Sequence, residues 1–290
     1  MSPQDPGPHG YFEWTTSAGQ AVRGTVTITN PSSTPATFDI YPADAATASG
    51  GGVIYSALGG SLHDTGRWVQ LDAGTVTLDA RQSHPIGFTV MIPTGTAPGD
   101  YLAGVAAQSP STPAATRVVL AVLAHVPGPG SVSFDLGTPT IVTLGKAGQV
   151  VRIPINDAGS LLSKPYVTAT LHRCGSAAPV SELRRQLDTF VPHTSIAYQW
   201  AIGHRIASGC YQLAATISVG TSVVSRVIAT STVTPAARAH GSVLSGGHVG
   251  KGGPPAWIVA LDSLLLLAVG SAGIALSLAR LGWRRRTVKR

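Results

Sequence analysis

TVTITNPSSTPATFDIY, residues 25–41, is the stretch that decides which fold the sequence predicts. In TVTITN (25–30) apolar side chains alternate with threonines, which is the two-residue period of a strand with one buried face. PSSTP then supplies turn residues, and ATFDIY (36–41) resumes the alternation with a phenylalanine and an isoleucine. We therefore expect a β-hairpin at this point in the chain.

Further segments of this kind follow at the spacing of about 8 to 12 residues that is typical of β-sandwiches. The other strands expected in the first half are WVQL (68–71), TVTL (75–78), IGFTVMIP (86–93), YLAGVAAQ (101–108) and TRVVLAVLAHV (116–126). VPGPGS (126–131) is a break rich in proline and glycine, after which the pattern starts again. The strands expected in the second half are 131–137, 148–157, 165–174, 194–202, 208–220 and 221–233.

The composition fits many short strands joined by turns, because charged residues are only 11% and the chain has 34 glycines and 21 prolines. The sequence predicts an all-β fold of two tandem immunoglobulin-like β-sandwiches, followed by a linker and one C-terminal transmembrane helix. The expected parts are an N-terminal tail (1–9), the first sandwich (10–127), the second sandwich (131–233), a linker rich in Gly, Ser and Pro (234–255), the membrane helix (257–281) and a basic tail (282–290).

The formal net charge of +7 is concentrated at the C-terminal end. Residues 1–255 hold 14 of the 20 Lys and Arg residues and 12 of the 13 acidic residues, which leaves 14 − 12 = +2. A nearly neutral globular part argues against a surface that binds nucleic acid, because such surfaces concentrate positive charge against phosphates.

The segment AWIVALDSLLLLAVGSAGIALSLA (256–279) has the length of a membrane-spanning helix. Ser263 to Ala279 is uncharged and would span roughly 26 Å as a helix, at about 1.5 Å per residue. Asp262 lies about one turn inside the outer boundary, where it can reach the headgroups. A buried core helix is the alternative, but it would not explain the basic residues that follow, which are Arg280, Arg284, Arg285, Arg286, Lys289 and Arg290. The positive-inside rule predicts a single-pass protein of the cell membrane, with its N-terminal domains extracellular and its C-terminus cytoplasmic.

The two cysteines, Cys174 and Cys210, form neither a CxxC motif nor a metal-binding spacing with histidine. In the oxidising compartment that this topology implies, one disulfide between them is expected, and two unpaired buried thiols are the alternative. An extracellular location also requires a secretion signal, yet MSPQDPGPHGYFEW (1–14) has no basic start followed by an apolar run. We expect the signal peptide to lie upstream of Met1, and membrane insertion by another route is the alternative.

HDTGRWVQL (63–71) is the segment that most resembles an active site, because it gathers a histidine, an aspartate, an arginine and a tryptophan. Neighbouring residues of an extended chain point apart, however, so we expect HDTG to be a turn and Trp68 to be a core residue against Ile28 or Phe88. The nine histidines form no HExxH pair, and the chain has no GxSxG, P-loop or GxGxxG motif. We expect no catalytic residue, no metal and no cofactor.

The run from Gly10 to Val126 resembles the peptidoglycan-binding domain of WxL-interacting proteins. The segments that carry the resemblance are GYFEWTTSAGQAVRGTVTITNPSSTPATFDIYPADA (10–45) and RWVQLDAGTVTLDARQSHPIGFTVMIPTGTAPGDYLAGVAAQ (67–108). These bacterial surface proteins have an N-terminal immunoglobulin-like domain, a second sandwich domain and a C-terminal membrane anchor with a basic tail. The second half of this chain is similar to the second family domain only in its class.

The resemblance implies a non-enzymatic protein whose first domain binds peptidoglycan or another wall glycan and whose second domain binds WxL-type or other surface proteins. Aromatic rings offer flat faces to sugars, so Tyr11, Trp14, Tyr41 and Tyr55 are hypothetical glycan contacts, with a place in the core or at a sheet edge as the alternative. Three other classes of function stay open: a chaperone-like subunit that captures strands by edge pairing, a structural stalk and a β-sandwich hydrolase.

Overall fold

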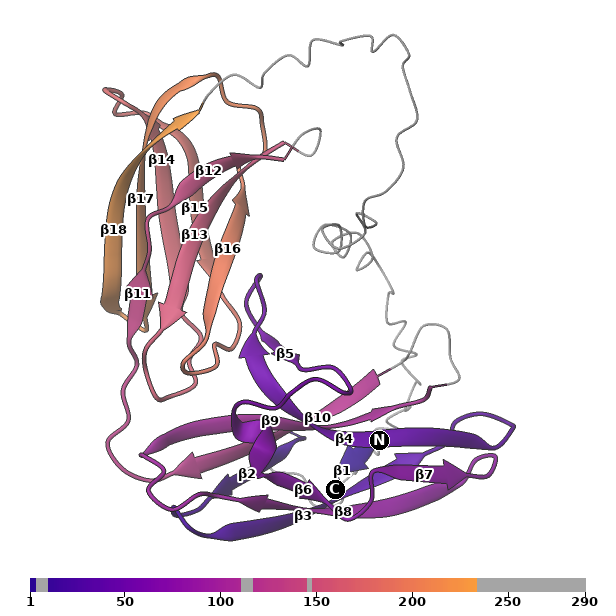
Figure 1. The fold of residues 1–290 in the computed structure, drawn as a ribbon. Helices are drawn as coiled ribbons and strands as arrows, with labels where there is room; N and C mark the ends of the chain where they lie inside the picture. Colours follow the sequence, from indigo (N-terminus) through magenta and orange to yellow (C-terminus); the bar gives the residue numbers. More distant parts are fainter. Residues whose placement is uncertain (4–9, 111–116, 145–147, 234–290) are drawn as a thin grey trace, which may run out of the picture. The chain divides into compact units, whose positions relative to one another are not determined.

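A computed structural model describes residues 1–3, 10–110, 117–144 and 148–233. These residues form two β-sandwiches, each with two sheets around an apolar core of its own (Figure 1). The all-β prediction is confirmed for this part of the chain. No helix within the described ranges is long and apolar enough to cross a membrane, and the predicted span 257–281 lies outside them, as do the predicted linker and basic tail.

The first sandwich has one sheet in the order β1-β3-β8-β6 and a second in the order β2-β10-β9-β4-β5, with β7 also pairing with β4. All pairs are antiparallel except β2 with β10. The strands are β1 (Ser2–Pro3), β2 (Phe12–Thr15), β3 (Ala21–Thr29), β4 (Ala36–Thr47), β5 (Val53–Tyr55), β6 (Val69–Leu71), β7 (Thr75–Leu78), β8 (Ser83–Met91), β9 (Gly99–Gln108) and β10 (Arg117–Val126), with a 3₁₀ turn, η1 (Thr65–Trp68), before β6.

The hairpin predicted from residues 25–41 is wrong. Both segments are strands, but β3 pairs with β8 in one sheet and β4 pairs with β9 in the other. Val26 and Ile28 of β3 and Ile40 of β4 are all buried, so the alternation was correct and only the pairing differs. The two apolar faces meet across the core, because the connection between the strands crosses from one sheet to the other.

Asn30 holds this crossing connection in place. Its side-chain nitrogen donates to the carbonyl oxygens of Thr34, Leu78 and Asp79 at 2.8, 3.1 and 3.0 Å. Its side-chain oxygen accepts the backbone N–H of Ser32 at 3.0 Å and the Ser32 hydroxyl at 2.7 Å. Asn30 is only 1% exposed, and a buried amide with its groups paired fixes the path of the chain.

In the second sandwich, β13 pairs with β11 and β12 and, along most of its length, with β16, while the other sheet has the order β15-β14-β17-β18. Its core contains Phe134, Phe190, Trp200 and Leu213. The strands are β11 (Phe134–Leu136), β12 (Thr140–Thr143), β13 (Gln149–Asp157), β14 (Tyr166–Arg173), β15 (Pro179–Gln186), β16 (Ser195–Ala201), β17 (Gly209–Val219) and β18 (Ser222–Val233).

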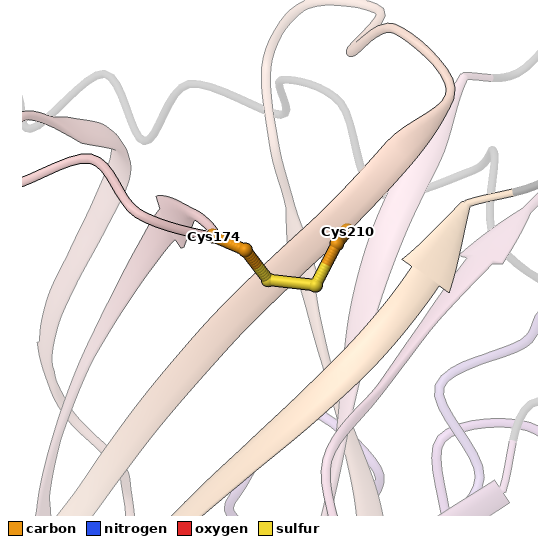
Figure 2. Close-up of a disulfide and its surroundings, with 2 residues drawn as sticks. All are labelled: Cys174 and Cys210. Carbon is orange, nitrogen blue, oxygen red and sulfur yellow. A yellow bond between two sulfur atoms is a disulfide. The ribbon is translucent and has the colours of Figure 1, made fainter.

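A disulfide joins Cys174 to Cys210, as predicted from the sequence, with the Cα atoms 5.4 Å apart. Figure 2 shows it bridging the end of β14 and the start of β17. The backbone N–H of Cys174 also donates to the carbonyl oxygen of Cys210 at 3.0 Å. The bond therefore reinforces two strands that are already neighbours in one sheet.

Candidate binding sites of the first sandwich

The HDTG segment is wrapped around a carboxylate of β4. Asp44 accepts the backbone N–H of His63 at 2.6 Å and of Asp64 at 3.2 Å through one oxygen, and that of Gly66 at 2.7 Å through the other. A Cβ on Gly66 would lie 2.6 Å from the Asp44 carboxylate, so glycine is needed for this close approach. The turn expected here is confirmed, and sequence reasoning missed Asp44, the residue that organises it.

Trp68 is not the central core residue that the sequence predicts. It ends the 3₁₀ turn η1, is half-buried, and packs on Tyr101 with ring centroids 4.8 Å apart. The short 3₁₀ turn delays the strand, which begins only at Val69. Val69 takes the fully buried position, and Trp68 covers the margin of the core.

One histidine–carboxylate pair joins two strands of the first sandwich. Nδ1 of His125 in β10 lies 2.7 Å from the Asp100 carboxylate, its neighbour across the ladder in β9. This side-chain contact links β9 to β10, so a structural role explains the pair. Within the described ranges no three or more histidines, cysteines or acids lie close enough together to hold a metal ion.

A hollow of about 370 Å³ lies beside β2, β3 and β8, and we call it the Trp14 hollow. Its lining residues are Phe12, Trp14, Arg23, Gly24, Thr25, Asp72, Pro85 and Gly87. The hollow therefore combines an aromatic ring with a pair of opposite charges, which are the groups that recognise the faces and hydroxyls of polar ring molecules.

Two glycines shape the Trp14 hollow. A Cβ on Gly87 would collide with the Asp72 carboxylate, so glycine lets that carboxylate lie against β8, where it pairs with the Arg23 guanidinium at 3.2 Å. A Cβ on Gly24 would lie 2.6 Å from the Phe88 ring. Glycine at these two positions therefore lets the Asp72 carboxylate and the Phe88 ring pack directly against the backbone, and both charged groups stay largely exposed.

Of the four aromatic residues suggested as glycan contacts, the structure places only Trp14 in this hollow. Its ring is half-buried and stacks on Phe12 with centroids 5.3 Å apart. Tyr41 is 7% exposed, and its hydroxyl donates to the side chain of Gln108 at 3.2 Å. A sugar contact from Tyr41 would require its ring to leave this place.

Tyr11 and Tyr55 pack against a separate apolar cluster that includes Leu102 and Leu123, whereas Trp14 packs against the main core of the sandwich. Burial raises the pKa of Tyr55 to about 12, and partial burial is also the main cause of the raised pKa of Tyr11. The four rings therefore do not form one continuous platform.

A larger cavity of about 620 Å³ lies at one end of the first core, and we call it the core groove. Ile28 of β3, Phe38 of β4 and Ala107 of β9 belong to the core and also line the groove. Its complete lining is Met1, Ile28, Thr29, Asn30, Pro31, Ser32, Thr34, Pro35, Ala36, Phe38, Ala107, Ser109 and Val118. The lining side chains are mostly apolar and include no charged one, so this end of the core is open as far as the described residues show.

The core groove borders a strand that is paired on one side only. β9 pairs with β10 over the full length of β10, from Arg117 to Val126, but β2 pairs only with residues 122–125. Within the described ranges, residues 117–121 therefore have a free edge. Val118 belongs to this half, is 40% exposed and lines the groove.

The pairing of β2 identifies which backbone groups face this free edge. The carbonyl oxygen of His125 accepts the N–H of Thr16 at 2.9 Å, so odd-numbered residues of β10 point towards the β2 side. Val119 and Ala121 therefore direct their N–H and C=O groups to the unpaired edge. Arg117 is fixed at the start of the strand, because its guanidinium donates to the carbonyl oxygens of Tyr55 and Ser56 at 3.0 and 2.7 Å.

No family model and no curated protein matches the chain. Similar solved structures include a chain of a chaperone–tip adhesin complex of CFA/I fimbriae biogenesis, at 12% identity, with 76% of this chain and 95% of that chain covered and a TM-score of 0.35. The class 5 fimbriae chaperone CfaA has 12% identity, 77% and 97% coverage and a TM-score of 0.34. The CupB2 chaperone of Pseudomonas aeruginosa has 8% identity, the same coverage and a TM-score of 0.34. Likenesses this weak decide nothing about the function of this chain.

Proposed function

We propose that this chain is a non-catalytic cell-surface protein that captures an extended segment of a partner protein at the core groove. One observation carries the proposal: the open end of the first core lies beside residues 117–121 of β10, which among the described strands pair only with β9. A strand added there would pair its backbone with Val119 and Ala121 and direct alternate side chains towards Val118 and the groove.

The lining of the groove determines the chemistry of the partner segment. Because none of the lining side chains is charged, a charged side chain inserted there would lose water without gaining a partner. An apolar side chain would instead extend the core, and its full burial would contribute about 1.5 to 3 kcal/mol. The expected ligand is an extended segment with apolar residues at alternate positions and without charge on that face.

Peptide binding by the full chain tests this function directly. The probe is a labelled nine-residue peptide in which valine or isoleucine alternates with threonine, and fluorescence anisotropy measures its affinity. Val118→Lys should weaken binding about tenfold or more, since it places a charge in the groove at a position exposed enough to tolerate it. Met91→Lys is the matched control, because Met91 is 48% exposed on β8 and does not line the groove.

Peptides methylated on the backbone nitrogen separate edge pairing from simple apolar contact. Methylation at one set of alternate residues removes the N–H groups that would face β10, and methylation at the other set leaves them intact. The proposal predicts that only one of the two peptides loses its binding. Equal binding by both peptides, or no difference between Val118→Lys and Met91→Lys, contradicts it.

The Trp14 hollow supports a second candidate function, which is binding of a wall glycan by the first sandwich. Its specific support is the Trp14 ring beside the exposed Arg23–Asp72 pair, since a sugar offers an apolar face to the ring and hydroxyls to the charges.

In a cosedimentation assay with purified cell-wall sacculi, Arg23→Ala should lower the pelleted fraction. Arg67→Ala, which removes an exposed arginine outside the hollow, should not. A wild-type chain that pellets no more than an unrelated sandwich domain contradicts glycan binding.

A further inference from the structure

The free edge of β16 in the second sandwich differs from the other strand edges within the described ranges. β16 (SIAYQWA, Ser195–Ala201) pairs with β13 on one side and with no described strand on the other (Figure 1). It has no charged residue, no proline and no shift of register against β13. Charged residues, prolines and register shifts are the devices by which proteins usually keep an edge strand from pairing with another chain, and β16 has none of them.

The other edges of the described strands each carry such a device or are short, and the unpaired half of β10 (117–121) begins with the charged Arg117. β15 contains Glu182, Arg184 and Arg185 and has a register shift against β14. β18 contains Arg226 and has a register shift against β17. β1, β2, β5, β6, β7, β11 and β12 are two to four residues long. β16, at seven residues, is therefore the long edge that lacks protection.

The hydrogen bonds at the two ends of β16 show which residues face its free edge. Thr194 accepts from Asp157 through its carbonyl oxygen at 2.9 Å, and Ile202 donates to Gln149 at 3.2 Å, both towards β13. Because the register between them is unbroken, the even-numbered residues point to β13. The N–H and C=O groups of the odd-numbered residues, which are Ser195, Ala197, Gln199 and Ala201, point to the free edge.

We propose that a second copy of this chain pairs with this edge, β16 against β16 in antiparallel orientation around a two-fold axis at Tyr198. Ala197 then forms a hydrogen-bonded pair with Gln199 of the other copy, and Ser195 forms one with Ala201. Each of these four residues is exposed and directs its backbone groups to the free edge, so the ladder is complete on both sides.

The side chains of β16 also suit this pairing. Ile196, Tyr198 and Trp200 are 8%, 5% and 6% exposed and lie on the core side, and the two-fold axis places Ile196 beside Trp200 of the other copy. The opposite face carries only serine, alanine and glutamine, which are small or uncharged. No like charges meet in this register, and aromatic–aliphatic pairs across strands are favourable.

Disulfide trapping in the purified full chain tests the register. Two variants are prepared separately, Ala197→Cys and Gln199→Cys, and then mixed under mild oxidation. In the proposed register, residue 197 of one copy and residue 199 of the other form a hydrogen-bonded pair, whose Cα atoms lie about 5.5 Å apart and within the range of a disulfide. The two copies of residue 197 are not opposite each other and lie farther apart. The proposal predicts a covalent dimer in the mixture and little in either variant alone. No dimer in the mixture, or equal dimer in the single variants, overturns it.

Sedimentation of the full chain over a range of concentrations gives a second readout. Ala197→Pro removes an N–H that points to the free edge and leaves the ladder with β13 intact, so the dimer dissociation constant should rise about tenfold or more. Ala197→Val keeps that N–H and is the matched control, with wild-type association expected. Circular dichroism confirms that each variant is folded. A wild-type chain that stays monomeric at every concentration overturns the proposal, whatever the outcome of peptide binding at the core groove.

Discussion

The side chain of Asn30 favours a connection from β3 to β4 that crosses between the two sheets over a hairpin within one sheet. Its amide links the turn after β3 to the end of β7 through the carbonyl oxygens of Leu78 and Asp79. Asn30→Ala would remove all the side-chain hydrogen bonds of this buried amide at once, so we expect a loss of about 2 to 4 kcal/mol in the free energy of unfolding. Urea denaturation measures the loss. Ser33→Ala, at an exposed neighbouring position, should change stability by less than about 0.5 kcal/mol, and equal effects of the two substitutions would contradict this role.

Asp157 is a buried carboxyl group at the end of β13. It is 1% exposed, and one of its oxygens accepts the N–H of Gly159 at 2.8 Å, while the other has no hydrogen-bond partner within the described ranges. Burial raises its pKa to about 6, although the Gly159 bond and nearby His193 act in the opposite direction. The folded state thus holds a proton on this group at a pH where the unfolded chain, with a pKa of about 3.9, has released it.

This group makes stability fall as the pH rises. Between about pH 4 and pH 6 the folded state binds more protons than the unfolded state, so the free energy of unfolding decreases through that window and stays lower at pH 7. Asp157→Asn keeps an oxygen for Gly159 and removes the charge, so it should raise stability at pH 7 by about 1 to 3 kcal/mol and flatten this window. Thermal unfolding at pH 4 and pH 7 measures both effects. Asp135→Asn, at an exposed position of β11, is the control, and an unchanged pH dependence in Asp157→Asn would refute the assignment.

At the scale of elements, the disulfide stabilises the sheet that contains β14 and β17. Its two cysteines are 36 positions apart, and closing a loop of this size removes enough entropy from the unfolded chain to contribute about 3 to 4 kcal/mol. Replacing both cysteines by alanine should therefore speed hydrogen exchange in β14 and β17. The strands β3 and β8 of the first sandwich serve as an internal control and should keep their exchange rates. Unchanged protection of β14 and β17 would show that the bond contributes little.

The long strands could be predicted from the sequence, because their inward positions alternate visibly. The strands expected at 101–108, 208–220 and 221–233 correspond closely to β9, β17 and β18. β15 was missed because PVSELRRQ is a mostly exposed edge strand whose charges hide the alternation. The strands β2, β5 and β12 are three or four residues long and were missed, whereas the equally short β6 and β7 were found from WVQL and TVTL.

Pairing and sites could not be predicted in the same way, because they depend on partners far apart in the chain. Nothing near Asp44 indicates that it organises a turn that begins 19 positions later. The segment TNPSSTP (29–35) does not show whether the chain forms a hairpin or crosses between sheets, because the residues that Asn30 binds to fix the crossing lie 48 and 49 positions away. The core groove and the free edge of β16 are likewise products of strand order, which a single sequence does not contain.

At the scale of the whole molecule, the sequence predicts that residues 257–281 anchor the chain and that both sandwiches lie outside the cell membrane. The full chain should then stay with the membrane fraction after extraction with alkaline carbonate. A chain that ends at residue 255 should appear in the soluble fraction with its sandwiches folded. Release of the full chain by carbonate would contradict the anchor, because such treatment removes proteins held only by polar contacts.

The direction of insertion is a separate consequence of the six basic residues between Arg280 and Arg290. Their charge favours the cytoplasmic side, so protease added to intact cells should digest both sandwiches and leave only a small C-terminal fragment. Replacing the six residues by glutamine removes this bias but leaves the apolar span unchanged, and we expect a larger share of chains to become protected from the protease. Both chains should resist carbonate equally, because the apolar length alone sets the strength of the anchor. Full protection of the wild-type sandwiches would refute the orientation, and with it the surface location on which capture of an extracellular partner depends.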